Sequence, residues 1–136
     1  MILVPGGPMQ SGIGNREKNQ VRERFAKGEV GQEELLASEC RAYHSPGTCT
    51  FYGTANSNQL IAEMLGLHLP GASFVNAETE LRTALTKAAA ARITGMTHLD
   101  TDNGGYTPLG RVISEKSIVN AMVGLLATGG STNETM

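Results

Sequence analysis

The sequence is poor in aromatic residues and in cysteine, and each scarcity excludes a class of protein. Aromatic residues make up 4% of the 136 residues and Trp is absent, so aliphatic side chains must fill any core. Two cysteines, Cys40 and Cys49, without a C-x-x-C pair, do not make a disulfide framework. All apolar stretches are shorter than the ~18 residues of a membrane span, and none follows a charged segment as in a secretory signal. We therefore expect no membrane contact and a cytoplasmic location.

An excess of charge of one sign is also missing. Lys and Arg number 11 and Asp and Glu 13, which gives a formal net charge of −2. Because the two signs are interspersed, no basic stripe is available for a phosphate backbone, and this argues against nucleic-acid binding. With 40% hydrophobic and 18% charged residues, the composition is typical of one soluble globular domain.

Both ends of the sequence have the pattern of interior segments. Residues 2–5 resemble a buried strand that enters a turn, and residues 128–133 form a glycine turn followed by a new helix cap. We therefore expect neighbouring sequence on both sides, so that residues 1–136 are one partial domain, truncated at both ends.

Hydrophobic spacing and capping residues predict five helices separated by glycine-rich turns. They cover residues 15–27, 33–43, 58–65, 79–93 and a last segment that begins at Ser114 and stops at Gly129. Short extended segments are predicted at residues 2–4 and 73–75. The predicted fold class is therefore α/β: a helix-rich three-layer domain with a small, mostly parallel sheet.

The same spacing predicts which side chains face the core. Leu36, Cys40 and Tyr43 lie along one side of the second helix, so we expect them to pack inward. Met64 and Met122 are expected to fill the core. The last helix has the largest apolar set, which consists of Ile118, Val119, Met122, Leu125 and Leu126.

The most informative segment for chemistry is the polar stretch around Cys49. Pro46 and Gly47 form a turn that would present Cys49 just before a helix begins. Backbone amides at a helix start favour a thiolate, which suits either a nucleophile or a ligand for soft iron. A buried, inert thiol is an equally good interpretation of the pattern alone. Ser45 and Thr48 precede this cysteine and are candidates for binding a substrate.

A second candidate site is Gly129-Gly130-Ser131-Thr132-Asn133. Glycines followed by a hydroxyl-bearing cap direct free backbone N–H groups toward an anion, so Ser131, Thr132 and Asn133 are further substrate-binding candidates. An ordinary helix end joined to the next helix cap explains the same residues. Local sequence leaves both interpretations open.

The loop at residues 5–14 and the three histidines give weaker indications. Ser11 and Asn15 have groups that can donate to a sugar acid, but the loop has no dinucleotide or Walker pattern. His44 lies five positions before Cys49, so a thiol-dependent enzyme is an alternative. His68 and His98 are expected at the surface, since no zinc-binding spacing surrounds them. The basic residues of the first helix form a solvated face, with an anion-facing role open for one of Arg16, Lys18, Arg22 and Arg24.

Four segments together resemble motifs of one enzyme family. They are PGGPM at 5–9, HSPGTCTFYGTANSNQ at 44–59, GLHLPG at 66–71 and LATGGSTN at 126–133. Their order and spacing resemble the family that unites dihydroxy-acid dehydratase, 6-phosphogluconate dehydratase and the sugar-acid dehydratases. Residues 50–53, Thr-Phe-Tyr-Gly, are typical of the phosphogluconate branch. By this resemblance, the chain is expected to be part of the family's N-terminal domain, which binds cluster and substrate.

The resemblance implies a lyase that dehydrates 6-phospho-D-gluconate to 2-keto-3-deoxy-6-phosphogluconate, a step of the Entner-Doudoroff pathway. It also implies an iron–sulfur cluster, 4Fe–4S in type, that acts as a Lewis acid, with a divalent cation such as Mg²⁺ as a further candidate cofactor. Cys49 matches the family's cluster cysteine in this loop. The partner molecule would be a phosphorylated sugar acid, and the parent protein would be a homodimer.

The resemblance also implies that the chain lacks parts of the catalyst. The family's other cluster cysteine lies in a C-D-K segment and its proposed serine base in a later domain, and neither segment is present. The catalytic residue is therefore unknown in this sequence, and we expect the isolated chain to be inactive. Two alternatives stay open: a dehydratase of another sugar acid or dihydroxy acid, and a non-catalytic binding module with the same fold.

Overall fold

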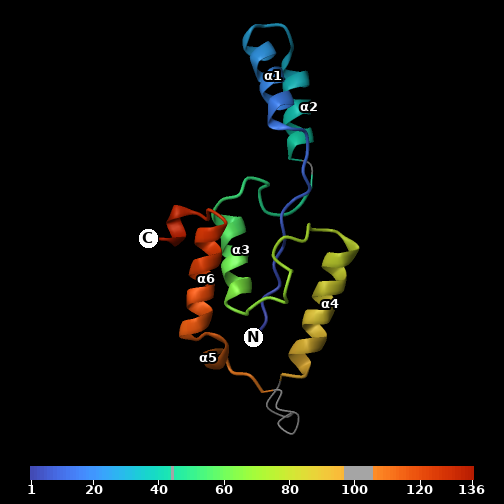
Figure 1. Ribbon diagram of the computed structural model, residues 1–136. Helices are drawn as coiled ribbons and strands as arrows, with labels where there is room; N and C mark the ends of the chain where they lie inside the picture. The colour runs from blue at the N-terminus through green and yellow to red at the C-terminus, as the bar shows by residue number, and fades with distance from the viewer. Residues whose placement is uncertain (44, 97–105) are drawn as a thin grey trace.

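The computed structural model describes residues 1–43, 45–96 and 106–136 and is built from helices (Figure 1). In chain order these are α1 Asn15–Ala26, α2 Gln32–Ala42, α3 Thr54–Met64, α4 Glu80–Thr94, α5 Leu109–Val112, α6 Glu115–Ala127 and the 3₁₀ helix η1 Thr132–Glu134. All five predicted helices are therefore present, and the short α5 was not predicted. None of the described helices is both long enough and apolar enough to cross a bilayer.

The predicted α/β class is wrong, because the described residues contain no β-strand and so no three-layer arrangement around a sheet. Residues 2–4 are extended, but their hydrogen bonding to another segment is a single bond from Leu3 N to Leu67 O (2.7 Å). One isolated parallel bridge joins Pro8 to Thr48. A strand needs a continuous ladder of such bonds, and Pro5 and Pro8 contribute no N–H to one. Residues 73–75, the other predicted extended segment, lie in turns.

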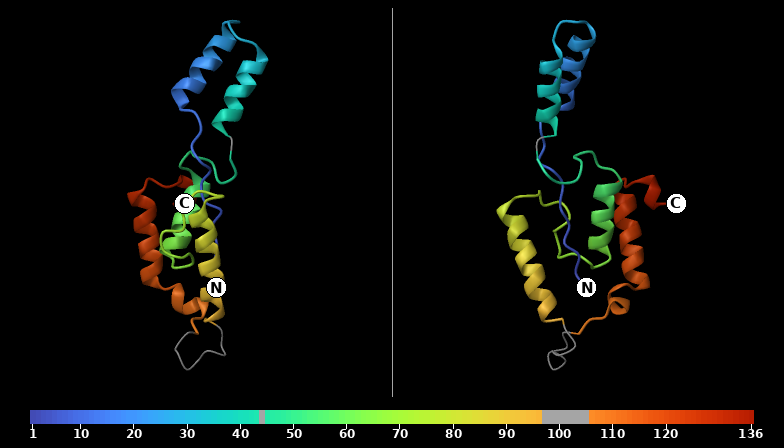
Figure 2. Two further views of the ribbon diagram at one scale, coloured as in Figure 1. Left: turned by 90° about the vertical axis from the view of Figure 1, so that its right-hand side faces the viewer. Right: turned by 180° about the vertical axis from the view of Figure 1, so that it is seen from behind.

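The helices form two parts that a narrow connection joins (Figures 1 and 2). Helices α1 and α2 pair as a hairpin that projects from the body, and the body contains α3, α4 and α6. The hairpin buries only small side chains at its contact: Val21 of α1 and Ser38 and Ala42 of α2. The predicted inner face of α2 is wrong, since Leu36 is 62% exposed, Tyr43 is 52% exposed and Cys40 is also exposed. Leu36, Cys40 and Tyr43 do have helical spacing, but α1 packs against the side of α2 that carries the small residues Ser38 and Ala42.

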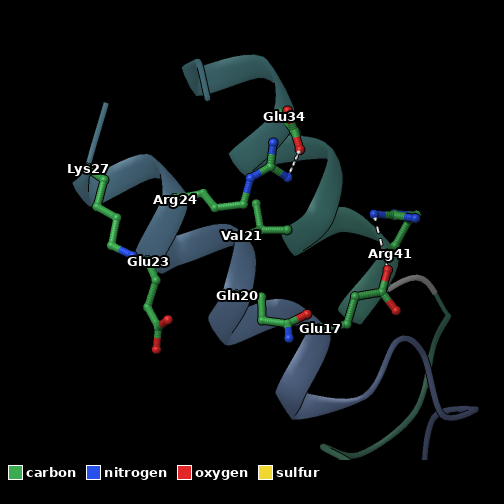
Figure 3. A pocket seen from close by; sticks show the side chains of 8 residues that line it. All are labelled: Glu17, Gln20, Val21, Glu23, Arg24, Lys27, Glu34 and Arg41. Atoms are coloured by element: carbon green, nitrogen blue, oxygen red, sulfur yellow. Dashed lines mark hydrogen bonds and ion pairs between the residues drawn. The ribbon is translucent and has the colours of Figure 1, made fainter. Parts of the chain in front are cut away.

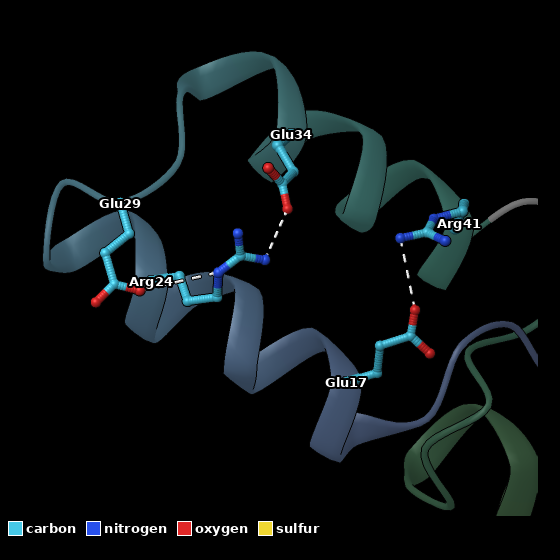
Figure 4. Close-up of polar contacts among 5 residues, drawn as sticks. All are labelled: Glu17, Arg24, Glu29, Glu34 and Arg41. Carbon is cyan, nitrogen blue, oxygen red and sulfur yellow. Dashed lines mark hydrogen bonds and ion pairs between the residues drawn. The ribbon is translucent and has the colours of Figure 1, made fainter.

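Ion pairs line the hairpin instead of an apolar seam (Figure 4). Arg24 contacts Glu34 at 3.0 Å and Glu29 at 3.9 Å, and Arg41 contacts Glu17 at 3.5 Å. An open groove of about 470 Å³ runs between the two helices, and its lining is charged with both signs (Figure 3). Exposed pairs of this kind contribute little to stability, so the hairpin is held mainly by its connection to the body and by its small buried contact.

In the body, α3 packs lengthwise against α6. The buried residues at this contact include Leu60 on α3 and Ala121, Gly124 and Leu125 on α6. A Cβ atom added at Gly124 would lie 3.1 Å from Cγ of Met64, so the two helices are close at this point. The close approach is possible because the contact side of α6 presents small residues.

Most of the predicted core face of α6 is exposed. Only Leu125 of the five residues is buried, whereas Ile118, Val119, Met122 and Leu126 are 47%, 55%, 57% and 70% exposed. Met64 is 41% exposed, so neither methionine is core filler. Helical spacing gave an apolar stripe, but α3 covers only one side of it.

Within the body, Arg82 joins helix α4 to the turn at residues 72–75. This arginine is 8% exposed, and its Nη2 donates to the carbonyls of Ala72 (2.6 Å) and Val75 (2.5 Å). Burial lowers the pKa of Arg82. The same turn buries His68, contrary to the predicted surface position, with Nδ1 3.1 Å from Oγ of Ser73. Burial also lowers the pKa of His68.

Two predicted helix starts are confirmed by their capping bonds. Thr79 Oγ1 accepts from the amide of Arg82 (3.2 Å), and Ser114 forms a reciprocal capping box with Ser117. Gly129 ends α6 with a φ of 65°, as its position in the sequence predicted. Helix boundaries elsewhere differ by a few residues, most of all at α3, which begins at Thr54.

Candidate functional site

Cys49 lies in the loop that leads from the hairpin to the N-terminus of α3. Its side chain is exposed, and its Sγ accepts a hydrogen bond from the amide of Phe51 (3.3 Å). The residue before α3, Gly53, has no side chain to cap the helix. The interpretation of Cys49 as a buried thiol is therefore wrong: the residue is exposed and its sulfur accepts one backbone amide, which suits a metal ligand or a nucleophile.

The turn before Cys49 is held against the glycine-rich turn at residues 5–9. Met9 N donates to Thr48 O (2.8 Å), and Thr48 N donates to Gly7 O (2.9 Å). Gly47 has a φ of 128°, and a Cβ atom there would lie 2.4 Å from Met9 N. Only glycine fits such a position, because other residues meet both backbone strain and a backbone clash. Two motifs that are 40 residues apart in sequence thus form one double turn behind the cysteine.

Ser45 and Thr48, two predicted substrate-binding residues, have protein partners in the described structure. Ser45 Oγ accepts from Gln10 N (2.9 Å). Thr48 Oγ1 donates to Oδ1 of Asn56 (2.6 Å) and accepts from Nε2 of Gln59 (3.2 Å). These contacts place both hydroxyls in the framework of the loop. Substrate contact by either residue stays a prediction.

The second predicted site lies directly beside the first. Oγ of Ser131 is 2.8 Å from Oγ1 of Thr54, the first residue of α3, and Nδ2 of Asn133 donates to the same Thr54 oxygen (3.3 Å). Tyr52, three residues after Cys49, donates to Thr128 Oγ1 (2.7 Å). Thr132 opens η1. The sequence predicted two separate sites, and the fold brings them to one end of α3.

A cavity of about 420 Å³ lies next to Cys49. Its walls come from the start of α1, the end of α2 and the cysteine loop; the lining consists of Ser11, Gly12, Ile13, Gly14, Asn15, Lys18, Ala42, Tyr43, Cys49, Thr50, Phe51 and Tyr52. Ser11 and Asn15, which the sequence indicated as donors to a sugar acid, are thus near the sulfur.

Lys18 gives this cavity its charge. Among the lining residues that the structure describes, it is the one cation and none is acidic. Glu39 on α2, outside this lining, is close enough to interact with the charge of Lys18. Lys18 Nζ donates to the Tyr43 hydroxyl (3.2 Å) and lies 5.0 Å from the centre of the Tyr43 ring. Hydroxyl groups, amides and one ammonium group around an open space can accommodate a small polyhydroxylated anion. Sequence reasoning named Lys18 only as one of four basic residues, because spacing along α1 does not show which of them faces the cavity.

Among residues 1–43, 45–96 and 106–136, no group of three or more His, Cys, Asp and Glu side chains could hold a metal ion. An iron–sulfur cluster needs about three or four protein ligands. Cys49 therefore fits one ligand position, and the described residues do not hold a cluster by themselves. Cys40 lies on α2 and is not in the lining of the cavity. His44 and His98 lie outside the described residues, which leaves the thiol-enzyme alternative without a placed partner for Cys49.

Comparison with known proteins defines the class of this chain. The family model described as dihydroxy-acid/6-phosphogluconate dehydratase N-terminal matches residues 1–136. The chain therefore belongs to the dihydroxy-acid/6-phosphogluconate dehydratase family, which confirms the resemblance found in its motifs.

Individual relatives are similar over nearly the whole chain. Phosphogluconate dehydratase of Pseudomonas aeruginosa is 58% identical over 135 residues, which are 99% of this chain and 22% of the relative. Phosphogluconate dehydratase of Escherichia coli (strain K12) is 54% identical over 136 residues and is also covered to 22%. Dihydroxy-acid dehydratase of Sulfurimonas denitrificans is 37% identical over 142 residues, 25% of its length. The chain thus spans about a fifth of the length of the phosphogluconate dehydratases that it matches.

Proposed function

We propose that the protein to which this chain belongs is a hydro-lyase that converts 6-phospho-D-gluconate to 2-keto-3-deoxy-6-phosphogluconate in the cytoplasm. The observation that supports this most is the difference in identity between relatives: 58% to a phosphogluconate dehydratase against 37% to a dihydroxy-acid dehydratase, each over 99% of the chain. The reaction removes the C2 proton and the C3 hydroxyl as water, and the resulting enol becomes the 2-keto acid. We expect the base for the C2 proton, and the contacts of a homodimer, to involve residues outside this chain.

In this proposal, residues 1–136 supply one ligand of an iron–sulfur cluster and part of the substrate pocket. Cys49 is the ligand, because its sulfur is exposed at the cavity and accepts the Phe51 amide. When bound, the cluster supplies a Lewis acid for the departing hydroxyl. The remaining ligands, and any Mg²⁺ site, are expected outside this chain, since one thiolate does not hold a cluster.

The substrate is proposed to enter the cavity beside Cys49. Lys18 is proposed to attract one of its anionic groups, either the carboxylate or the phosphate, because it is the one charged side chain among the described residues that line the cavity. Ser11 and Asn15 have donors and acceptors for the sugar hydroxyls. The hydroxyl cluster around Ser131 and Asn133 lies at the same end of α3 and is proposed to contact the substrate or to support the loop that does.

The substrate assignment is tested by comparing three compounds with the full-length enzyme under anaerobic conditions. We expect turnover of 6-phosphogluconate, slower turnover of gluconate, which lacks the phosphate, and little turnover of a branched 2,3-dihydroxy acid. Equal or faster turnover of the dihydroxy acid would assign the protein to the other branch of the family.

The role of Lys18 is tested in the same assay. Lys18→Met is expected to raise KM roughly 10- to 100-fold, which corresponds to the loss of a charge-assisted hydrogen bond of about 1.5–3 kcal/mol. Lys27→Met is the matched control, because Lys27 is an exposed lysine at the other end of α1, away from the cavity lining. An unchanged KM in Lys18→Met would remove Lys18 from the pocket without affecting the reaction assignment.

A further inference from the structure

Asn56 makes an unusual set of contacts in the first turn of α3. Its side chain is buried, with 3% of the residue exposed, and its Nδ2 donates to two carbonyl oxygens, those of Cys49 (2.8 Å) and Phe51 (2.9 Å). One amide group therefore closes the loop on both sides of Thr50. Phe51, whose carbonyl oxygen accepts from Asn56, donates its backbone N–H to the sulfur of Cys49 (3.3 Å).

The other side of the Asn56 amide is also fixed. Thr48 Oγ1 donates to Asn56 Oδ1 (2.6 Å) and accepts from Gln59 Nε2 (3.2 Å). Gln59 Oε1 in turn accepts from Gly7 N (2.9 Å). A continuous chain of hydrogen bonds thus runs from the glycine-rich turn through Gln59 and Thr48 to Asn56 and ends at the cysteine loop.

This chain requires an amide at position 56. The nitrogen faces two acceptors and the oxygen faces a hydroxyl donor, so both ends of the amide are used. An aspartate has nearly the same shape, but it would place a negatively charged oxygen against the carbonyls of Cys49 and Phe51. Buried polar networks hold their geometry only when every member is satisfied. A single change from NH₂ to O therefore opens the loop while the size of the side chain is preserved.

We propose that Asn56 is a positioning residue that sets the direction of the Cys49 sulfur toward the cluster. This inference rests on the proposed function, in which Cys49 is a cluster ligand. Ligand atoms must lie within about 0.2 Å of their coordination distance, and loss of the groups that orient a metal ligand typically lowers metal affinity 10- to 100-fold. The role needs no contact between Asn56 and the cluster, because the loop backbone transmits it.

The experiment uses the full-length protein, reconstituted anaerobically with iron and sulfide, and measures the rate of iron loss to a chelator. Asn56→Asp is expected to lose iron 10- to 100-fold faster than the unmodified protein. The matched control is Asn58→Asp, which makes the same change two residues further along α3 at an exposed position. Asn58→Asp is expected to lose iron at the original rate.

A second variant and a second readout separate positioning from folding. Thr48→Val leaves Asn56 in place but removes the hydroxyl that orients it, and iron loss should be several-fold faster at a temperature where circular dichroism shows the variant to be fully folded. After one-electron reduction of the remaining cluster, its electron paramagnetic resonance spectrum should shift in both variants, because the direction of the thiolate ligand would differ. A purely structural role would leave that spectrum unchanged.

The outcomes distinguish this inference from the proposed function. If Cys49→Ser removes the cluster but Asn56→Asp and Thr48→Val keep iron at the original rate, with unchanged spectra, Asn56 has no positioning role. If Cys49→Ser itself keeps an intact cluster, the proposed function fails together with this inference.

Discussion

Gly47→Ala is the substitution that most directly tests how the cysteine loop is built. The backbone at Gly47 has a φ of 128°, and an added Cβ would lie 2.4 Å from Met9 N and 2.7 Å from the carbonyl carbon of Pro8. These clashing atoms belong to the backbone, so no change of side-chain rotamer can relieve the clash. The turn at 47–48 must therefore move away from residues 7–9, and the hydrogen bonds between Thr48 and its two partners in that turn must stretch or break.

The cost of this change follows from two terms. Backbone strain at such a φ is about 1–3 kcal/mol, and two lost backbone hydrogen bonds add about 0.5–1.5 kcal/mol each. We therefore expect Gly47→Ala to lower the free energy of unfolding by roughly 2–6 kcal/mol. The measurement is urea unfolding of the 136-residue polypeptide, followed by far-ultraviolet circular dichroism, together with hydrogen exchange at the Met9 amide.

Gly28→Ala is the control for strain without a clash. Gly28 also has a positive φ, 74°, but a Cβ there meets no atom within 4 Å. Its cost should be limited to about 1–2 kcal/mol. Equal destabilisation by the two substitutions, with the Met9 amide still protected in Gly47→Ala, would refute the reasoning that the two turns are in direct contact.

Two further predictions concern the body. Glu63 accepts from the amides of Gly71 (2.6 Å) and Ser73 (2.9 Å). Burial alone would raise its pKa, but the Ser73 side chain, these two amides and the nearby His68 together outweigh burial and lower it. The bonds are therefore intact above the ordinary pKa of a glutamate and are lost as the pH falls through the lowered pKa of Glu63. Hydrogen exchange at both amides should accelerate in that pH range. Glu63→Gln should show faster exchange already at neutral pH. Gly124→Ala should change the free energy of unfolding by less than about 1 kcal/mol, because better helix propensity offsets the displacement of the flexible Met64 side chain, whereas Gly124→Val should cost about 1–3 kcal/mol in the same urea assay. Fast hydrogen exchange of the Gly71 and Ser73 amides at all pH values would contradict the first prediction. An unchanged free energy of unfolding in Gly124→Val would contradict the second.

Local features of the fold followed from the sequence. Thr79 and Ser114 cap helices as predicted, and Gly129 ends one, because these effects depend on a few adjacent residues. The class of the fold did not follow. Residues 2–4 have strand-like composition, but a strand exists only where a second segment supplies the other half of the ladder.

Burial was the least predictable property. Cys40 and Met122 lie on apolar stripes at correct helical spacing, and both are exposed. His68 was expected at the surface and is buried against Ser73. Periodicity shows which side chains share a face, but it does not show whether another element covers that face.

The candidate site was predictable in part. The sequence singled out Cys49 as a candidate ligand but left open whether it is buried, and it singled out residues 128–133 as a candidate anion site. Their meeting at the start of α3 depends on the packing of α3 against α6, which no local pattern contains. Sequence reasoning assigned Asn56 no role beyond membership of the motif at 44–59. Its two hydrogen bonds to the cysteine loop could be recognised only from the folded chain.

The central claim, that the sulfur of Cys49 binds the iron–sulfur cluster, is tested most directly by comparing two serine variants of the full-length protein. Iron content and visible absorbance are measured after anaerobic reconstitution of Cys49→Ser and Cys40→Ser. The account predicts that Cys49→Ser loses the cluster absorbance and that Cys40→Ser, altered on α2 at a residue outside the cavity lining, keeps it. Full iron content and an unchanged spectrum in Cys49→Ser would contradict the account.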